Sequence, residues 1–275
     1  MDAIRDKMDE ALAQVRRRYD GEVRVAIILG TGLGGLAEHI DREAVIDYRD
    51  IPHFPHSTAL SHRGQLVIGK LGGVPVVAMQ GRCHLYEGYS SEDVGMPVLL
   101  MNAMGAKGLI VSNASGGMNP LHNSGDILVI EDHINLMWDT SLEPLAGLGR
   151  VRCNEKTVLP YDSELVELAM SVARREHFAA HRGVYVSVSG PTYETRAEYR
   201  LFRKIGGDVV GMSTIPEVVV GASCGMRIMA LSMITNIARP DAPEKVDAED
   251  VVEIAARCEP NLRKIVMEAL HEFSE

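Results

Sequence analysis

Short runs rich in Val, Ile and Ala recur along this chain, and most of them stop at glycine or at a polar residue. The run at 23–29 ends at Gly30, which is typical of a strand buried on both faces of a sheet. The runs at 65–68 and 74–79 flank a Lys-Leu-Gly-Gly turn and predict a β-hairpin. We expect strands over residues 23–29, 65–68, 74–79, 108–113, 127–130, 184–188, 209–211 and 227–234.

Between these runs, apolar residues return every three or four positions, which predicts helices. The segment 1–19 has this spacing among many charges and predicts an amphipathic surface helix, not a signal peptide. In the last helix, Asp247 is a candidate N-cap and Pro260 predicts a kink or an interruption. We expect helices over residues 1–19, 91–104, 163–176, 196–205, 216–222 and 248–272. The alternation of strands and helices predicts an α/β fold, and we expect a single domain over residues 1–275.

Composition and charge exclude several classes of function. The 275 residues are 46% hydrophobic, with 28 Lys and Arg against 38 Asp and Glu, so the formal net charge is −10. This balance argues against a general binder of nucleic acid or anionic membranes, and any anion must be captured locally. The four cysteines are far apart and indicate reduced thiols in a cytoplasmic protein. The longest apolar region is interrupted by Arg227, so we expect no membrane span.

A glycine-rich turn follows the first predicted strand. Gly30-Thr31-Gly32-Leu33-Gly34-Gly35 satisfies G-x-G-x-x-G, and Asp47 or Asp50 lies where a ribose-binding acid of a dinucleotide fold would fall. The possible helix at 33–40 is short, however, and a hairpin follows instead of another βα unit. The alternative is an anion nest, in which backbone N–H groups and the Thr31 hydroxyl point at inorganic phosphate.

A second polar cluster follows the strand at 74–79. Arg82, His84 and Tyr86 are spaced two apart, so in extended chain they emerge on one side. A guanidinium can clamp a phosphate with two hydrogen bonds, and the histidine adds a donor. The alternative for this motif alone is an edge strand with a solvated polar face.

Two other segments have competing interpretations. The small residues of 112–120, Ser-Asn-Ala-Ser-Gly-Gly-Met-Asn-Pro, either let a ligand approach the backbone or form an ordinary glycine-rich turn. His53, His56 and His62 suggest a metal site, but Pro55 disrupts helical spacing and no nearby cysteine completes a ligand set. We expect no metal.

Three later segments bring an acid, an amide and a hydroxyl to strand ends. They are Gly-Pro-Thr-Tyr-Glu-Thr at 190–195, Gly-Met-Ser-Thr at 211–214 and Ile-Thr-Asn at 234–236. A buried Glu194 and a buried Asn236 both need hydrogen-bond partners, and a planar heterocycle with N–H donors and acceptors supplies them. This combination suggests a purine site. The alternatives are core packing for Met212 and a solvated helix-cap carboxylate for Glu194.

With the phosphate motifs, these segments resemble the trimeric purine nucleoside phosphorylases over roughly residues 28–236. The resemblance implies a central mixed, partly barrel-like sheet surrounded by helices, and a homotrimer. It implies no cofactor, because inorganic phosphate is a co-substrate. Its phosphate ligands would be Thr31, His62, Arg82, His84, Ala114 and Ser213. Its base and ribose contacts would be Tyr86, Ala114, Tyr193, Glu194, Met212 and Asn236.

The resemblance also implies the chemistry. Phosphate attacks C1′ of the sugar while negative charge moves onto the purine, and a hydrogen bond from Asn236 to N7 strengthens as that charge develops. His84 and Glu194 would support this step. An Asn here implies inosine, guanosine and their 2′-deoxy forms, whereas the related methylthioadenosine phosphorylases have Asp. The alternatives are a methylthioadenosine or 6-aminopurine nucleoside phosphorylase, and a sensor that binds purine and phosphate without turnover.

The chain departs from the family pattern at four places. Family members often have a histidine for the ribose 5′-hydroxyl shortly before the last helix, and residues 245–249 contain none. A neighbouring subunit usually contributes a Phe from the loop that we expect at 140–160, a candidate lid or subunit contact, and this loop has no Phe. Ser115 stands where the family usually has Ala, and Arg196 where Pro or an apolar residue is frequent.

Overall fold

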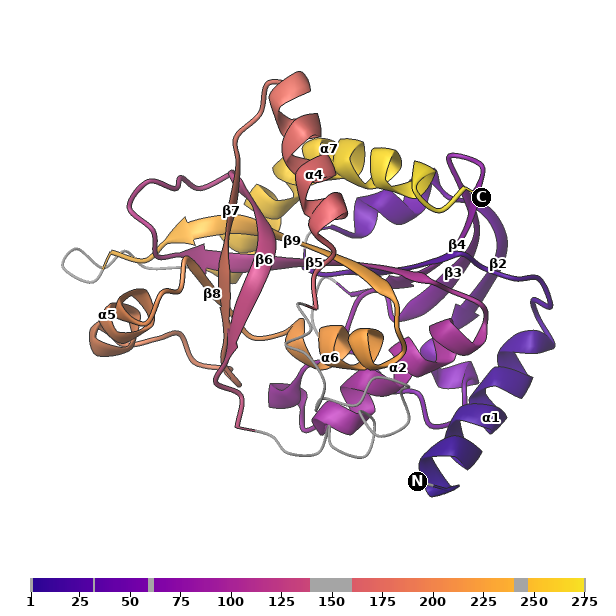
Figure 1. Ribbon diagram of the computed structural model, residues 1–275. Coiled ribbons are helices and arrows are strands. Elements are labelled where there is room, and N and C mark those ends of the chain that lie inside the picture. The colour runs from indigo at the N-terminus through magenta and orange to yellow at the C-terminus, as the bar shows by residue number, and fades with distance from the viewer. Residues whose placement is uncertain (1, 32, 59–61, 139–159, 240–246, 275) are drawn as a thin grey trace.

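The computed structural model describes residues 2–31, 33–58, 62–138, 160–239 and 247–274 (Figure 1). The strands are β1 (Val25–Leu29), β2 (Asp41–Asp47), β3 (Gln65–Leu71), β4 (Val74–Gln80), β5 (Gly108–Gly117), β6 (Ile127–Asn135), β7 (Ala180–Ser187), β8 (Val209–Gly211) and β9 (Arg227–Ile237). The α-helices are α1 (Asp2–Arg16), α2 (Ser91–Ala103), α4 (Ser163–Arg175), α5 (Arg196–Lys204), α6 (Ile215–Ser223) and α7 (Ala248–His271). Three 3₁₀ helices are η1 (Gly34–His39), η2 (Tyr48–Asp50) and η3 (Leu85–Glu87).

Within the described ranges, the strands form one mixed sheet in the order β2-β3-β4-β1-β5-β8-β7-β6-β9. β1 lies parallel to both β4 and β5, while β2, β3 and β4 form an antiparallel meander. β9 pairs with β6 and also with β5, so this half of the sheet closes on itself. The carboxyl ends of the parallel strands β1, β4, β5 and β9 lie at the same edge, where the glycine-rich and polar segments begin.

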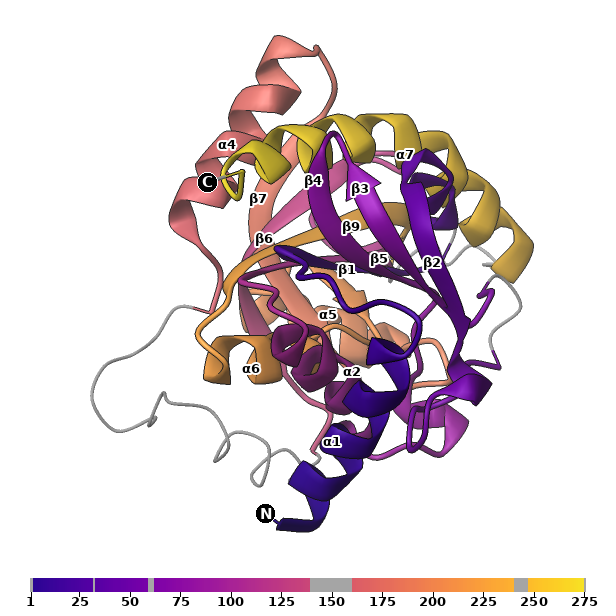
Figure 2. The same ribbon diagram turned by 90° about the vertical axis from the view of Figure 1, so that its right-hand side faces the viewer.

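Helices cover both faces of the sheet. In β1, Ala26 and Ile28 pack in one core with side chains of α1, α2 and α6, while Val25 and Ile27 pack in a second core with α4 and α7. Figure 2 shows α1, α2 and α6 on one side of the sheet and α4 and α7 on the other. Because successive side chains of β1 are buried on opposite faces of the sheet, every residue of Val25–Leu29 is apolar.

The fold class predicted from the sequence is confirmed, and several boundaries differ. β2 was not predicted, because its sequence Asp-Arg-Glu-Ala-Val-Ile-Asp is mostly exposed and charged and pairs only at the sheet edge. β5 continues to Gly117 instead of stopping at Asn113, since its glycines face β8 and β9 closely. β7 begins at Ala180, four residues earlier than predicted.

One helical prediction also needs correction. α7 runs through Pro260 without interruption, because Leu262, Ile265 and Val266 are fully buried and their packing outweighs the lost hydrogen bond. Residues 196–205 and 163–176 form helices as predicted. No helix in the described part of the chain is long and apolar enough to cross a membrane.

Candidate active site

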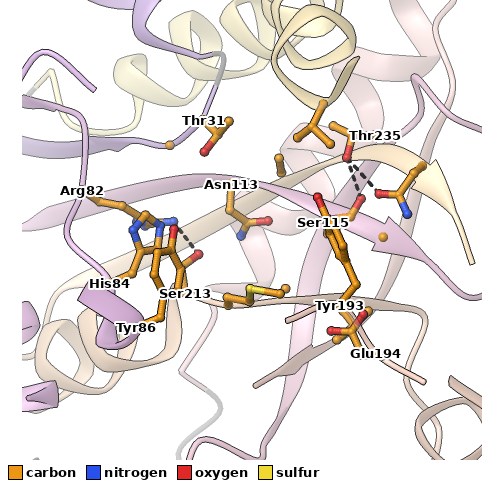
Figure 3. A pocket seen from close by; sticks show the side chains of 18 of the residues that line it. Thr31, Arg82, His84, Tyr86, Asn113, Ser115, Tyr193, Glu194, Ser213 and Thr235 are labelled. Atoms are coloured by element: carbon orange, nitrogen blue, oxygen red, sulfur yellow. Dashed lines mark hydrogen bonds between the residues drawn. The ribbon is translucent and has the colours of Figure 1, made fainter. Parts of the chain in front are cut away.

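A pocket opens where the carboxyl ends of β1, β5 and β9 meet the segments after β4 and β8 (Figure 3). Its empty space is about 690 Å³, which includes space open to solvent. The residues that line it are Gly30, Thr31, Arg82, His84, Tyr86, Asn113, Ala114, Ser115, Gly116, Tyr193, Glu194, Tyr199, Val210, Gly211, Met212, Ser213, Thr235, Asn236 and Val251. Segments far apart in sequence therefore meet in one cavity, as the motifs predicted.

The turn after β1 supplies Thr31 to one end of this pocket. A Cβ on Gly30 would lie 2.6 Å from the Ser112 carbonyl oxygen of β5, so the close approach of two backbones requires glycine. The residues that follow form the 3₁₀ helix η1, and the chain then enters β2, which is antiparallel to β3. The dinucleotide interpretation is wrong, since that fold requires an α-helix and a parallel strand here.

Arg82 is 1% exposed and is held almost entirely by the protein. Its Nη1 donates to the Ser112 carbonyl oxygen at 3.1 Å and to the Ser213 hydroxyl at 2.9 Å. Its Nε lies 3.0 Å from Oε1 of Glu217, which is equally buried, in an ion pair without hydrogen-bond alignment. Nη2 has no hydrogen-bond partner within the described ranges. The guanidinium is thus fixed at the pocket wall beside Ser213.

His84 and Tyr86 lie beside Arg82, but not in the extended chain that the sequence predicted. Tyr86 is in η3, and its ring stacks on the His84 imidazole with centroids 4.6 Å apart. His84 Nδ1 lies 2.8 Å from Oε1 of Glu87, and Thr58 donates to the other oxygen. Burial alone would raise the pKa of Glu87, but these hydrogen bonds outweigh it and lower the pKa to about 2. With Nδ1 engaged by this carboxylate, Nε2 of His84 is the nitrogen left for a ligand.

His62 lies next to the pocket wall and not on its surface. Its Nδ1 is 2.8 Å from the Arg82 carbonyl oxygen, its ring stacks near His84 with centroids 5.6 Å apart, and its Nε2 has no partner in the structure described. Burial lowers the pKa of His62 to about 4, so it is neutral near pH 7. His53 is instead paired with Glu10, and no group of three metal-ligating side chains occurs among the described residues.

The segment after β8 places Met212 and Ser213 in the same pocket. Ser213 accepts from Arg82, while Met212 Sδ is so close to Gly190 that a Cβ there would lie 2.4 Å away. Ala114 lies on the pocket wall opposite, on β5. Met212 is therefore pocket lining and is only half buried, which argues against the core-packing alternative.

Tyr193, Glu194 and Thr235 are at the other end of the pocket (Figure 3), and Asn236, which follows Thr235, lines the pocket too. The Tyr193 side chain is 52% exposed, whereas burial raises the pKa of the Glu194 carboxyl, a shift that the Tyr199 hydroxyl opposes as a hydrogen-bond donor. The Asn236 Oδ1 accepts from the Thr235 hydroxyl at 3.3 Å. The α5 cap is made by Thr195 and Glu198, so Glu194 is free of the capping role that was its alternative.

Several pocket residues were not singled out from the sequence. Tyr199 and Val251 come from the first turns of α5 and α7, and each lies on a helix face that an amphipathic pattern alone assigns to packing or solvent. Asn113 and Thr235 are buried polar residues next to motif residues, a signal that could have been used. The predictions for the loop 140–160 and for residues 245–246 lie largely outside the described residues.

A family model described as the phosphorylase superfamily matches residues 24–271. The chain belongs to the phosphorylase superfamily, among its purine nucleoside phosphorylases. It is 40% identical over 273 residues to Purine nucleoside phosphorylase 1 of Bacillus subtilis, covering 98% of this chain and 100% of that protein. A Schistosoma purine nucleoside phosphorylase solved with hypoxanthine matches with a TM-score of 0.85 and 36% identity over 98% of each chain. The Schistosoma mansoni enzyme solved with adenosine matches with a TM-score of 0.83 and 35% identity, also over 98% of each chain.

Membership of this family makes the chain an enzyme, a pentosyltransferase of the purine nucleoside phosphorylase type. It also agrees with the pocket, whose two ends have different chemistry. One end has Thr31, Arg82, His84 and Ser213, all donors that suit an anion. The other has a carboxylate and an amide, which suit the polar edge of a heterocycle.

Proposed function

We propose that this enzyme cleaves 6-oxopurine nucleosides, inosine and guanosine with their 2′-deoxy forms, using inorganic phosphate. The products are the free purine and (2-deoxy)ribose 1-phosphate. The observation that carries the proposal is that Glu194 and Asn236 share one cavity with Arg82, His84 and Ser213. A purine bound by Glu194 and Asn236 and a phosphate bound by the three anion-end residues leave the sugar between them, beside Tyr86 and Met212.

In this arrangement the protein acts by position and charge. Thr31, Arg82, His84, Ser213 and the backbone of Ala114 would hold phosphate below C1′ of the sugar, with His62 behind them. Fixing the nucleophile there removes the entropic cost of bringing two reactants together. As the glycosidic bond lengthens, the sugar becomes cationic and the purine anionic, and the phosphate dianion stabilises the first of these.

The base end distinguishes substrates. Asn236 would donate from its Nδ2 to purine N7, which gains negative charge in the transition state, and Glu194 would accept from N1–H and a 2-amino group. The Thr235 hydroxyl lies 3.2 Å from the Ser115 carbonyl oxygen and 3.3 Å from Asn236 Oδ1, and its one proton serves only one of these acceptors at a time. Tyr193 would stack near the base. A 6-oxopurine supplies the N1–H that Glu194 needs, whereas a 6-aminopurine does not.

Further expectations belong to the same proposal. We infer a homotrimer in the cytoplasm with no resident cofactor or metal, serving purine salvage. A second candidate is a 6-aminopurine or methylthioadenosine phosphorylase. The observation that favours it is that the Schistosoma mansoni relative was solved in complex with adenosine. A sensor that binds without turnover is less favoured, because the donors at the anion end face the same cavity as Asn236.

The test is base release from inosine, guanosine, adenosine and methylthioadenosine, each with and without phosphate. Phosphate-dependent turnover of inosine and guanosine, with adenosine at least about tenfold poorer in kcat/KM, supports the proposal. Preference for adenosine or methylthioadenosine would reverse the assignment of the base end. Binding of guanine by calorimetry with no turnover of any nucleoside would favour the sensor.

A further inference from the structure

Thr214 has a backbone conformation that threonine rarely adopts. Its φ is 79° and its ψ is −45°, and the amide of Ile215 donates to the Ser213 carbonyl oxygen at 2.9 Å. These values define a γ-turn centred on Thr214, between β8 and α6. Positive φ is unfavourable for any side chain and most of all for one branched at Cβ, so the surrounding structure must hold this residue in place.

The side chain of Thr214 is what fastens the turn to the pocket wall. It is 0% exposed, and its Oγ1 accepts from Asn113 Nδ2 at 2.8 Å and from Arg82 Nη1 at 3.2 Å. Both donors line the pocket, and Thr214 itself lies behind them. The strained residue therefore connects Asn113 on β5 with Arg82, which follows β4.

These contacts decide where the neighbouring hydroxyl points. Because Thr214 Oγ1 accepts two hydrogen bonds, its own proton is left for Ser213 Oγ, 3.2 Å away. Ser213 Oγ also accepts from Arg82 Nη1 at 2.9 Å, which uses its lone pairs. With both lone pairs used, the Ser213 hydroxyl has its proton left to donate.

The network continues across the sheet and fixes Asn113. Ser232 Oγ lies 2.6 Å from Asn113 Oδ1 and 2.6 Å from Ser115 Oγ. A hydroxyl has one proton, so Ser232 donates to Asn113 and accepts from Ser115. With its oxygen occupied in this way, the Asn113 amide presents Nδ2 to Thr214. Ser232 is fully buried and Ser115 is 4% exposed, so water does not compete.

The geometry points to Thr214 as a positioning residue of the anion end: its hydroxyl, held by Asn113, orients the Ser213 O–H and the Arg82 guanidinium toward phosphate. This inference rests on the proposed function, since it names the residue that prepares that function's phosphate site. A residue kept only for folding would need neither the positive φ nor two donors from the pocket wall. The strained conformation of Thr214 is retained because it permits the hydrogen bonds that orient the Ser213 and Arg82 donors.

Three substitutions separate the hydroxyl from the backbone conformation. Thr214→Val keeps the shape and removes the hydroxyl, Thr214→Ser keeps the hydroxyl, and Thr214→Gly relieves the strain and removes the hydroxyl. The control is Ser223→Ala, which removes a buried hydroxyl at the last residue of α6 that donates to the Val220 carbonyl oxygen. We would measure KM for phosphate and for inosine, and phosphate binding by calorimetry without nucleoside.

We expect Thr214→Val and Thr214→Gly to raise the phosphate KM and Kd at least about tenfold, with the inosine KM within about threefold. Thr214→Ser and Ser223→Ala should keep both values within about threefold of the wild type. Equal effects on both substrates, or wild-type phosphate binding in Thr214→Gly, would overturn the inference. If Thr214→Val does not fold, the Gly and Ser variants decide. Absence of phosphate-dependent turnover in the wild type would instead refute the proposed function.

Discussion

The Nε atom of Arg82 lies 3.0 Å from Oε1 of Glu217, and each side chain is only 2% exposed. Arg82 follows β4 and Glu217 is in the first turn of α6, so this ion pair joins the two segments that bracket the anion end of the pocket. The buried carboxylate therefore opposes the positive charge of the guanidinium at the pocket wall. An incoming phosphate is therefore held by directed N–H and O–H groups more than by net positive charge, which agrees with the overall charge of −10.

Removing one member of this pair should be costly. Glu217→Gln leaves Arg82 buried without its counter-ion, and we expect the free energy of unfolding to fall by about 3–5 kcal/mol. The control is Glu176→Gln, since Glu176 pairs with Lys264 at 3.2 Å on the surface, where solvent screens the pair, and its loss should change stability far less. Urea unfolding of both variants measures the difference. Equal small losses would mean that Arg82 finds another partner.

Gly30 should not tolerate a side chain. In Gly30→Ala, the new Cβ would lie 2.6 Å from the Ser112 carbonyl oxygen, so the Thr31 turn must move away from β5. We expect lower thermal stability and a phosphate KM raised by about tenfold or more, because a displacement of about 1 Å in a binding loop has effects of that order.

The matched control for this substitution is Gly35→Ala. Its Cβ would meet only the Glu259 side chain at 3.7 Å, an ordinary contact. This variant should keep the phosphate KM of the wild type. Similar kinetics for the two variants would show that the approach of the Thr31 turn to β5 is unimportant for the anion end.

Asn236→Asp tests the base end. A carboxylate cannot donate to N7 unless it is protonated, so kcat/KM for inosine should fall by about 100-fold or more, the effect expected for losing one hydrogen bond that strengthens in the transition state. Adenosine should lose less, because its 6-amino group can donate to the new carboxylate. Steady-state kinetics with both nucleosides measure the ratio. If the ratio of kcat/KM for inosine to kcat/KM for adenosine did not change, Asn236 would have no role in discriminating between the two bases.

Buried histidines predict how stability depends on pH. Burial lowers the pKa of His62 from 6.5 to about 4, and burial together with the neighbouring His181 lowers the pKa of His122. The unfolded chain therefore binds more protons than the folded chain below about pH 6.5, so the free energy of unfolding should fall as the pH drops from about 6.5 toward about 4. His122→Phe should make this fall shallower in urea unfolding across that range. If the free energy of unfolding of this variant fell with pH as steeply as that of the wild type, or more steeply, the lowered pKa of His122 would be contradicted.

The local segments of the anion and base ends could be predicted because each has its own chemistry in sequence. Arg82 with His84, and Glu194 with Asn236, are polar residues at the ends of apolar runs, and all four line one pocket. Periodicity also placed the buried strands, as in β1, since a strand apolar at every position has to be covered on both faces. It could not find β2, whose exposed residues are specified by edge pairing alone.

Tertiary structure decided what pattern and spacing leave open. The Gly30 motif could belong to a dinucleotide fold only if an α-helix followed it. The chain forms the 3₁₀ helix η1 there instead, and η1 packs against α7. The roles of Glu217, Thr214 and Asn113 depend on hydrogen bonds and ion pairs between segments far apart in sequence. The sequence by itself determined which residues can bind a phosphate and a purine, because that follows from side-chain chemistry. Only the tertiary structure determined how those residues are held, because buried polar groups acquire their orientation from partners that no local pattern encodes.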